Sequence, residues 1–179
     1  MGRAQAEGGR RRFEGFVDRL SRALHHADRK EPLRLYLTGL LLPGMVERRR
    51  GGILNVASTA AFQPGPGMAV YYATKAYVLS FSEALAEELA GTGVTVTAVC
   101  PGPTATNFGA AANMHPLGLV NKISMSAEAV AVLGHRAYRC GRVVAVTGLR
   151  NQILAFLTRL GPRAAVRKIT KRLNGVQHD

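Results

Sequence analysis

The chain has 179 residues, of which 47% are hydrophobic, and carries a formal net charge of +13. This length and apolar content suit one domain with a real core and exclude a chain that is disordered by composition. No run reaches the roughly 18 apolar residues of a membrane-spanning helix, and the basic N-terminus lacks the apolar centre of a secretory signal.

The expected elements alternate between helices and strands. Apolar residues at helical spacing predict the helices, and short β-branched runs predict the strands. Ser126 is expected to cap the last of three central helices, with Glu128 in its first turn, where the helix dipole favours an acid. In chain order, we expect a short helix at about 12–25, a helix at 33–46 that Pro43 and Gly44 weaken, a strand at 53–57, a loop at 58–67, a helix at 71–90, a strand at 94–99, a helix at 126–139 and a strand at 142–147.

This alternation predicts an α/β fold, in which helices flank a parallel sheet of about three strands joined by right-handed crossovers. We expect this domain to occupy residues 33–150. An atypical basic segment precedes it at 1–32, and a basic, amphipathic helical tail follows it at 151–179.

The two cysteines, Cys100 and Cys140, show no metal-ligand spacing, so reduced thiols in a cytoplasmic protein and no metal are expected.

Three residues suggest chemistry at one end of the sheet. Tyr71 and Lys75 lie four positions apart on the predicted helix, which places them on one face about one turn apart. Ser58 directly follows the predicted strand at 53–57, at the carboxyl end of the sheet, where ligands bind in open α/β folds. Spacing alone is weak evidence, because a tyrosine and a lysine meet in this way on many helices.

Hydride transfer to a carbonyl would use all three side chains. The hydride leaves an alkoxide, so a proton donor is needed within hydrogen-bond reach of the oxygen. A phenol such as Tyr71 can donate, although its free pKa of about 10 is too high for exchange at neutral pH. The ammonium of Lys75 favours the phenolate and lowers that pKa, and the hydroxyl of Ser58 can orient the carbonyl.

The stretch from Gly52 to Phe108 resembles the core of the short-chain dehydrogenase/reductase family. The family's Tyr-x-x-x-Lys motif matches Tyr71 to Lys75, and its catalytic serine, thirteen residues before the tyrosine, matches Ser58. The resemblance implies a Rossmann-type sheet and an oxidoreductase that transfers a hydride between a nicotinamide cofactor and a carbonyl or alcohol. Tyr72 competes with Tyr71 as the acid, but it lies fourteen residues from the serine and three from the lysine, so Tyr71 is preferred.

The same resemblance implies a cofactor site. The cofactor is NAD or NADP, with NADP slightly preferred, and Tyr71 and Lys75 are expected at its nicotinamide ribose. The loop after the strand at 94–99 matches the family's Pro-Gly motif and later threonine and is expected to contact the nicotinamide. Its matching residues are Pro101, Gly102, Thr104 and Thr106.

The front of the chain departs from the family. The family begins with a strand and a Gly-rich turn that holds the cofactor pyrophosphate at a helix N-terminus. Residues 1–32 contain no such turn, and the place of the family's catalytic asparagine, near Arg29 and Lys30, holds basic residues. We therefore expect a truncated member that retains the last three strands, with an exposed edge at the strand 53–57.

Three interpretations remain open. The first is an active oxidoreductase on a small carbonyl or alcohol substrate, and the second is an inactive remnant that only associates with partners or a membrane surface. For this second interpretation, the resemblance implies homodimer contacts through helices 33–46 and 71–90. In the third, the basic tail, whose apolar residues alternate with arginines and lysines, lies at an anionic membrane surface, although a substrate lid or dimer contact is the preferred role. No nucleic-acid motif is present.

Overall fold

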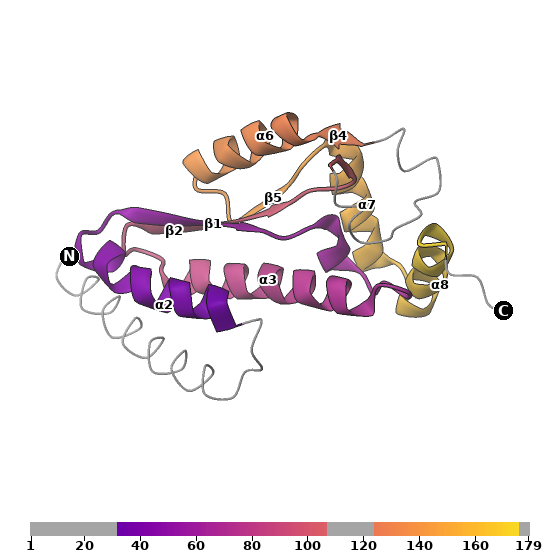
Figure 1. Ribbon diagram of the computed structural model, residues 1–179, viewed down its shortest axis with the longest axis horizontal. Coiled ribbons are helices and arrows are strands. Elements are labelled where there is room, and N and C mark those ends of the chain that lie inside the picture. Colours follow the sequence, from indigo (N-terminus) through magenta and orange to yellow (C-terminus); the bar gives the residue numbers. More distant parts are fainter. Residues whose placement is uncertain (1–31, 107–123, 176–179) are drawn as a thin grey trace. The chain divides into compact units, whose positions relative to one another are not determined.

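A computed structural model describes residues 32–106 and 124–175 of the chain. The expected helix at 12–25 and the segments outside these ranges therefore lie beyond the described residues. Figure 1 shows helices and a sheet that alternate along the chain. In order, the elements are α2 (Pro32–Glu47), β1 (Gly51–Val56), the 3-10 helix η1 (Thr59–Phe62), α3 (Ala69–Glu88), β2 (Val94–Cys100), β3 (Thr104–Ala105), β4 (Met125–Ser126), α6 (Ala127–Arg139), β5 (Val144–Val146), α7 (Leu149–Leu160) and α8 (Arg163–Leu173).

The predicted α/β class is confirmed. The main sheet has three strands in the order β1-β2-β5, and β2 pairs with β5 in parallel, so that Ala98 lies opposite Val144. A second, two-stranded pairing joins β3 to β4, also in parallel. Among the described strands β1 is an edge of the main sheet, as expected, and its Leu54 and Val56 are 43% and 53% exposed.

The described chain clusters into two compact units. One contains the described residues up to Ile53 together with Ala84–Val96, and the other contains Leu54–Glu83 together with the described residues from Thr97 onward. In the first unit, the buried side chains come from α2, the end of α3, the turn that follows it and the start of β2. They are Leu35, Thr38, Leu42, Leu85, Leu89, Thr92, Val94 and Val96.

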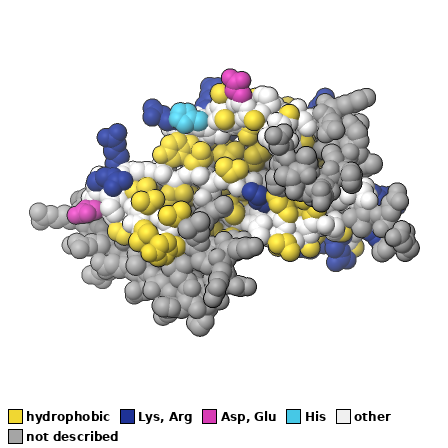
Figure 2. Space-filling model, in the orientation of Figure 1, with side chains coloured by type: hydrophobic (Ala, Val, Ile, Leu, Met, Phe, Trp, Pro, Cys, Tyr) yellow, Lys and Arg dark blue, Asp and Glu magenta, His cyan; other side chains and the backbone are white. Residues whose placement is uncertain are grey.

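The helix α2 continues beyond the predicted weak point and ends at Glu47. Pro43 lacks the N–H that would bond to the carbonyl four residues earlier, so it removes one hydrogen bond from the helix. Burial offsets that loss, because Leu42 next to it is completely buried and Leu35 and Thr38 are also in the core. The other side of α2 is apolar and open to solvent, as the yellow side chains over this helix in Figure 2 show.

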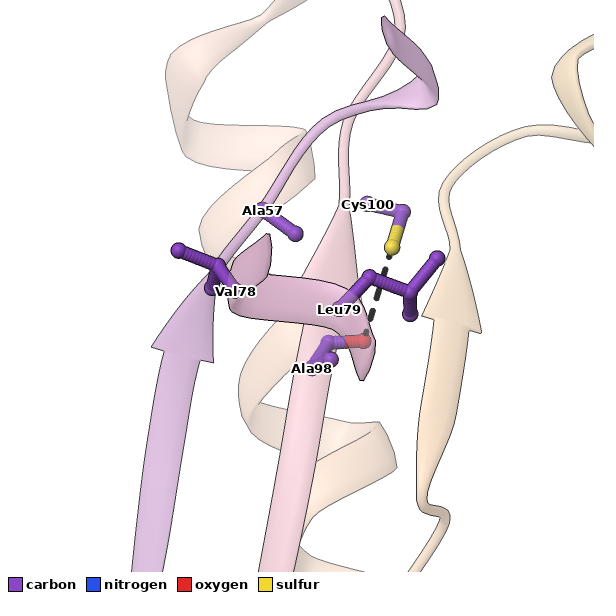
Figure 3. Packing of buried hydrophobic residues seen from close by; sticks show 5 residues of the cluster. All are labelled: Ala57, Val78, Leu79, Ala98 and Cys100. Carbon is purple, nitrogen blue, oxygen red and sulfur yellow. Dashed lines mark hydrogen bonds between the residues drawn. The ribbon is translucent and has the colours of Figure 1, made fainter. Parts of the chain in front are cut away.

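The core of the second unit lies between the sheet and α3 (Figure 3). Ala57, Val78, Leu79, Ala98 and Cys100 form its buried cluster. A buried polar chain runs beside this cluster: Asn55 Nδ2 donates to Ser82 Oγ at 2.9 Å, and Ser82 Oγ donates to the Val78 carbonyl at 2.7 Å. These bonds satisfy polar groups that would otherwise be costly to bury, and they join the strand that precedes Ser58 to the helix that carries Tyr71.

The predicted cap of α6 is present. The side chain of Ser126 accepts a hydrogen bond from the Ala129 backbone N–H at 3.1 Å, and Glu128 lies in the first turn. The tail forms two helices, α7 and α8, as its apolar and basic pattern predicted. Of the two cysteines, Cys100 is buried in the cluster and Cys140 is exposed at the end of α6.

Candidate active site

Ser58 lies just beyond the carboxyl end of β1, as predicted. It caps η1, because its Oγ accepts the Ala60 backbone N–H at 3.1 Å. The same hydroxyl donates to the carbonyl of Pro101 at 3.4 Å, and the Thr59 backbone N–H donates to that carbonyl at 2.8 Å. The structure therefore brings together two predicted site segments, the serine after β1 and the Pro-Gly loop after β2.

Tyr71 and Lys75 lie side by side in the first half of α3. The Lys75 Nζ is 5.8 Å from the centroid of the Tyr71 ring, within the range of a cation–π contact. The same Nζ donates to the backbone carbonyl of Val56 at 3.0 Å. The ammonium is thus held between the phenol ring and the last residue of β1, which places it near the carboxyl end of the sheet.

Tyr72, the rival of Tyr71, points its hydroxyl at the C-terminal tail. Its Oη donates to Asn174 Oδ1 at 3.1 Å, and Asn174 Nδ2 donates to the Pro66 carbonyl at 2.9 Å. Burial raises the pKa of Tyr72 above its usual value of 10.0, and the hydrogen bond with Asn174 lowers it by a smaller amount. Its ring also fills the space that a side chain at Gly65 would need, since a Cβ there would lie 2.1 Å from the ring.

The Pro-Gly loop packs against the start of α7. A Cβ added at Gly102 would lie 2.3 Å from Asn151 Nδ2, so a larger residue there would displace the Asn151 amide. Within the loop, Thr104 Oγ1 donates to the Gly102 carbonyl at 2.9 Å, and Pro103 accepts the Met125 backbone N–H at 3.0 Å. Thr106 lies in an exposed position at the end of the described loop.

Sequence reasoning did not identify the contacts of the tail with this region. Thr158 Oγ1 donates to the Phe62 carbonyl at 3.4 Å, and the Arg159 guanidinium lies 5.7 Å from the Phe62 ring. With Asn174 they attach α7 and α8 to the segment between Ser58 and Tyr71. The sequence signal at this place is the Asn174-Gly175 pair, which marks the end of a helix but does not predict the contacts of the Asn174 side chain.

Part of the chain is similar to proteins of one family. A family model described as short chain dehydrogenase matches residues 34–116. An NADP-dependent 3-hydroxy acid dehydrogenase of Salmonella typhi is 53% identical over 68 residues, which is 38% of this chain and 27% of that protein. A very-long-chain 3-oxoacyl-CoA reductase of Rattus norvegicus is 38% identical over 119 residues, which is 66% of this chain and 38% of that protein. The chain therefore spans well under half the length of these curated relatives.

Solved structures show the same fold. A short-chain dehydrogenase from Sphingobium yanoikuyae in complex with NADPH has a TM-score of 0.60 at 26% identity, covering 84% of this chain and 56% of that one. One from Burkholderia cenocepacia in complex with NADP has a TM-score of 0.61 at 24% identity, over 79% of this chain and 55% of that one. The order of helices and strands and the serine–tyrosine–lysine spacing agree with these similarities, so residues 34–116 of the chain are similar to the short-chain dehydrogenase family.

Proposed function

We propose that this chain supports hydride transfer between NAD(P) and a carbonyl or alcohol substrate. The observation that carries the proposal is the position of Lys75, whose ammonium contacts the Tyr71 ring and bonds to the last residue of β1. Ser58 follows that strand by two residues. The phenol of Tyr71, the ammonium of Lys75 and the hydroxyl of Ser58 thus come from adjacent parts of one unit. They lie at the end of the sheet where open α/β folds bind ligands.

Each of the three side chains has its own role in this proposal. Tyr71 donates its phenolic proton to the carbonyl oxygen in reduction and takes it back in oxidation. The positive charge of Lys75 stabilises the phenolate that remains. Ser58 gives up its 3.4 Å bond to the Pro101 carbonyl and donates instead to the substrate oxygen, where negative charge develops.

The residues present fit the nicotinamide end of the cofactor. An ammonium, two threonine hydroxyls and the backbone of a Pro-Gly loop supply the donors and acceptors that a ribose and a carboxamide require. The bound nicotinamide would supply or accept the hydride. In this proposal Tyr71 and Lys75 hold the ribose, and the loop residues Pro101, Gly102, Thr104 and Thr106 line the nicotinamide. The described ranges 32–106 and 124–175 contain no Gly-rich turn for the pyrophosphate.

The hydrogen bonds of Tyr72 favour Tyr71 as the acid. The Tyr72 hydroxyl is engaged with Asn174, and burial raises its pKa, so its proton is harder to transfer. Tyr71 instead lies beside the ammonium of Lys75. The names of the relatives suggest the substrate class, because both a 3-hydroxy acid dehydrogenase and a 3-oxoacyl-CoA reductase act at the third carbon of an acyl chain. We infer a 3-oxo or 3-hydroxy acyl substrate and NADP as the preferred cofactor.

A cofactor titration followed by turnover tests the proposal. We expect NADPH fluorescence to change on binding, more strongly than NADH fluorescence. In an active preparation, Tyr71→Phe is expected to lower turnover by about a hundredfold or more, while Tyr72→Phe retains most of it. A chain that binds neither cofactor would support the alternative of an inactive remnant. Full turnover in Tyr71→Phe would remove Tyr71 from the mechanism.

For the partner, we propose a homodimer through helices 33–46 and 71–90. The exposed apolar side of α2 supports it, with Leu40 and Leu41 at 59% and 58% exposure. Burying such side chains gains roughly 1.5–3 kcal/mol each. Sedimentation equilibrium should show a dimer that Leu40→Arg converts to a monomer, whereas Val132→Arg, an equally exposed site on α6, should leave it intact.

A further inference from the structure

The helix α7 presents an apolar stripe to solvent. Leu149, Ile153, Phe156 and Leu160 recur at intervals of four, three and four residues, which places them along one side of the helix. They are 71%, 51%, 61% and 67% exposed. Large apolar side chains exposed singly are ordinary, but a contiguous row of four on one helix indicates a surface that contacts something. We call these four residues the α7 stripe.

The side of α7 opposite the stripe is fixed to the body of its unit. Ala155 is buried, Asn151 Nδ2 donates to the Thr147 carbonyl at 2.7 Å, and Thr158 Oγ1 contacts the Phe62 carbonyl. In α8, Thr170 is buried, and Asn174 just beyond the helix bonds to Tyr72 and Pro66. The tail is therefore anchored on one side, and the α7 stripe lies on the side that these contacts leave open.

The two tail helices carry charge of a single sign. The two helices and their connector, residues 149–175, contain no aspartate or glutamate. On α8, Arg163, Arg167, Lys168 and Arg172 are exposed and Lys171 is half-buried, so most of the basic side chains reach solvent. The basic residues of this stretch are Arg150, Arg159, Arg163, Arg167, Lys168, Lys171 and Arg172.

These two features select one kind of partner. A second copy docked through the same helices would bring an equally basic surface against this one, and like charges repel. A nucleic acid would neutralise the charge but leave the α7 stripe in water. An anionic lipid surface satisfies both, because acyl chains accept the apolar side chains while lipid phosphates attract the arginines and lysines.

We propose that α7 and α8 form a docking surface for an anionic lipid bilayer, with the α7 stripe inserted at the boundary of headgroups and acyl chains. The proposal goes beyond the proposed function and does not depend on it. It describes attachment to one leaflet, and no helix among residues 32–106 and 124–175 is long and apolar enough to cross a bilayer. Because the tail is hydrogen-bonded to residues between Ser58 and Tyr71, docking would hold the candidate site at the lipid surface.

Vesicle sedimentation with the full chain tests the proposal directly. We expect the protein to sediment with phosphatidylcholine vesicles that contain about a quarter phosphatidylglycerol, and to remain largely in solution with phosphatidylcholine alone. Raising the salt to about 0.5 M should weaken the binding, since it screens the attraction between arginines and lipid phosphates. Cofactor binding is measured on the same samples, so a failure of the proposed function would be recognised separately.

Two pairs of matched variants assign the binding to this surface. Arg163→Glu with Arg167→Glu should weaken vesicle binding by at least about tenfold, whereas the same reversals at Arg136 and Arg139 on α6 should have little effect. Phe156→Gln should weaken it at either salt concentration, and Val132→Gln, at 60% exposure on α6, serves as its control. Circular dichroism confirms that each variant is folded.

Three outcomes would overturn the proposal. The first is the absence of sedimentation with the phosphatidylglycerol vesicles at low salt. The second is binding that the α8 and α6 reversals weaken equally, which would indicate a general effect of net charge. The third is a concentration-dependent dimer that Phe156→Gln dissociates in the absence of lipid, which would assign the α7 stripe to a second copy.

Discussion

Lys75 contacts the Tyr71 ring and the Val56 carbonyl, and one of these two contacts could be predicted from the sequence while the other could not. Its place one turn from Tyr71 follows from the four-residue spacing on a helix, and the structure confirms that the ammonium lies beside the ring. Its bond to the Val56 carbonyl could not be predicted, because that contact depends on how a helix is set against a strand nineteen residues earlier. The roles of Ser58, Tyr71 and Lys75 in catalysis stay predictions.

Asn174 is a residue whose importance only the structure reveals. It accepts from Tyr72 and donates to the Pro66 carbonyl, so Asn174→Ala should cost about 1–2 kcal/mol of unfolding free energy. Urea unfolding of Asn174→Ala, Tyr72→Phe and the double variant should give a coupling energy of about 1 kcal/mol. Arg172→Ala, two residues away and exposed, is the control. Additive effects of the two changes would show that the hydrogen bond does not stabilise the tail.

Cys100 provides a prediction of pH dependence. Burial raises the pKa of this thiol to about 12, from an ordinary value of 9.0. A group whose pKa is raised on folding stabilises the protein below the unfolded pKa and loses that contribution as pH rises through the folded one. Unfolding free energy should therefore fall between about pH 9 and pH 12 by more in the parent chain than in Cys100→Ala. If the unfolding free energies of the parent chain and Cys100→Ala depended equally on pH, the raised pKa of Cys100 would be contradicted.

A thiol-reactive dye tests the same burial near neutral pH. It should label the exposed Cys140 quickly and Cys100 only after unfolding.

At the scale of elements, the described helices and strands of the core were predicted to within a few residues. The spacing of apolar residues and the content of β-branched residues are properties of the local sequence. In β1, α3 and β2, burial in the folded chain favours the same helix or strand that these local patterns predict. The short pairing of β3 with β4 was not predicted, since two-residue strands carry no pattern. The helix predicted at 33–46 does continue past Pro43 to Glu47, because burial of Leu42 outweighs the weak local propensity of its last turn.

The turn between α3 and β2 offers a matched pair of glycines. Gly91 and Gly93 both have positive φ, at 79° and 84°. A Cβ at Gly91 would meet nothing within 4 Å, but a Cβ at Gly93 would lie 2.2 Å from the backbone oxygen of Arg49. We expect Gly91→Ala to cost about 1 kcal/mol from strain alone and Gly93→Ala about 3 kcal/mol or more. Thermal unfolding measures both, and equal costs would mean that the close approach to Arg49 is not rigid.

At the scale of the whole molecule, the sequence predicted the class of fold and the exposed edge strand. Leu54 and Val56 lie exposed on one face of β1, while Asn55 between them is buried and bonded to Ser82. The division into domains at residues 32 and 150 stays a prediction, as does a cytoplasmic location. The clustering into two units was not anticipated, since it depends on contacts within the folded chain.

Exposure of β1 should be visible as self-association. An apolar strand at a sheet edge pairs readily with other chains, and a lysine there opposes such pairing. Leu54→Lys should therefore reduce light scattering at high protein concentration without lowering the unfolding temperature. Val132→Lys adds the same charge to α6 and should change scattering less. If both variants reduce scattering equally, net charge rather than the strand edge controls association.

The absence of acidic residues from 149–175 has a consequence for control by the cell. Arginine and lysine keep their protons far above neutrality, and carboxylates that acidification could neutralise are missing from this stretch. Attachment through these helices would therefore be insensitive to the changes in pH to which histidine-based sensors respond. Removing or masking the lipid phosphates would weaken this attachment instead.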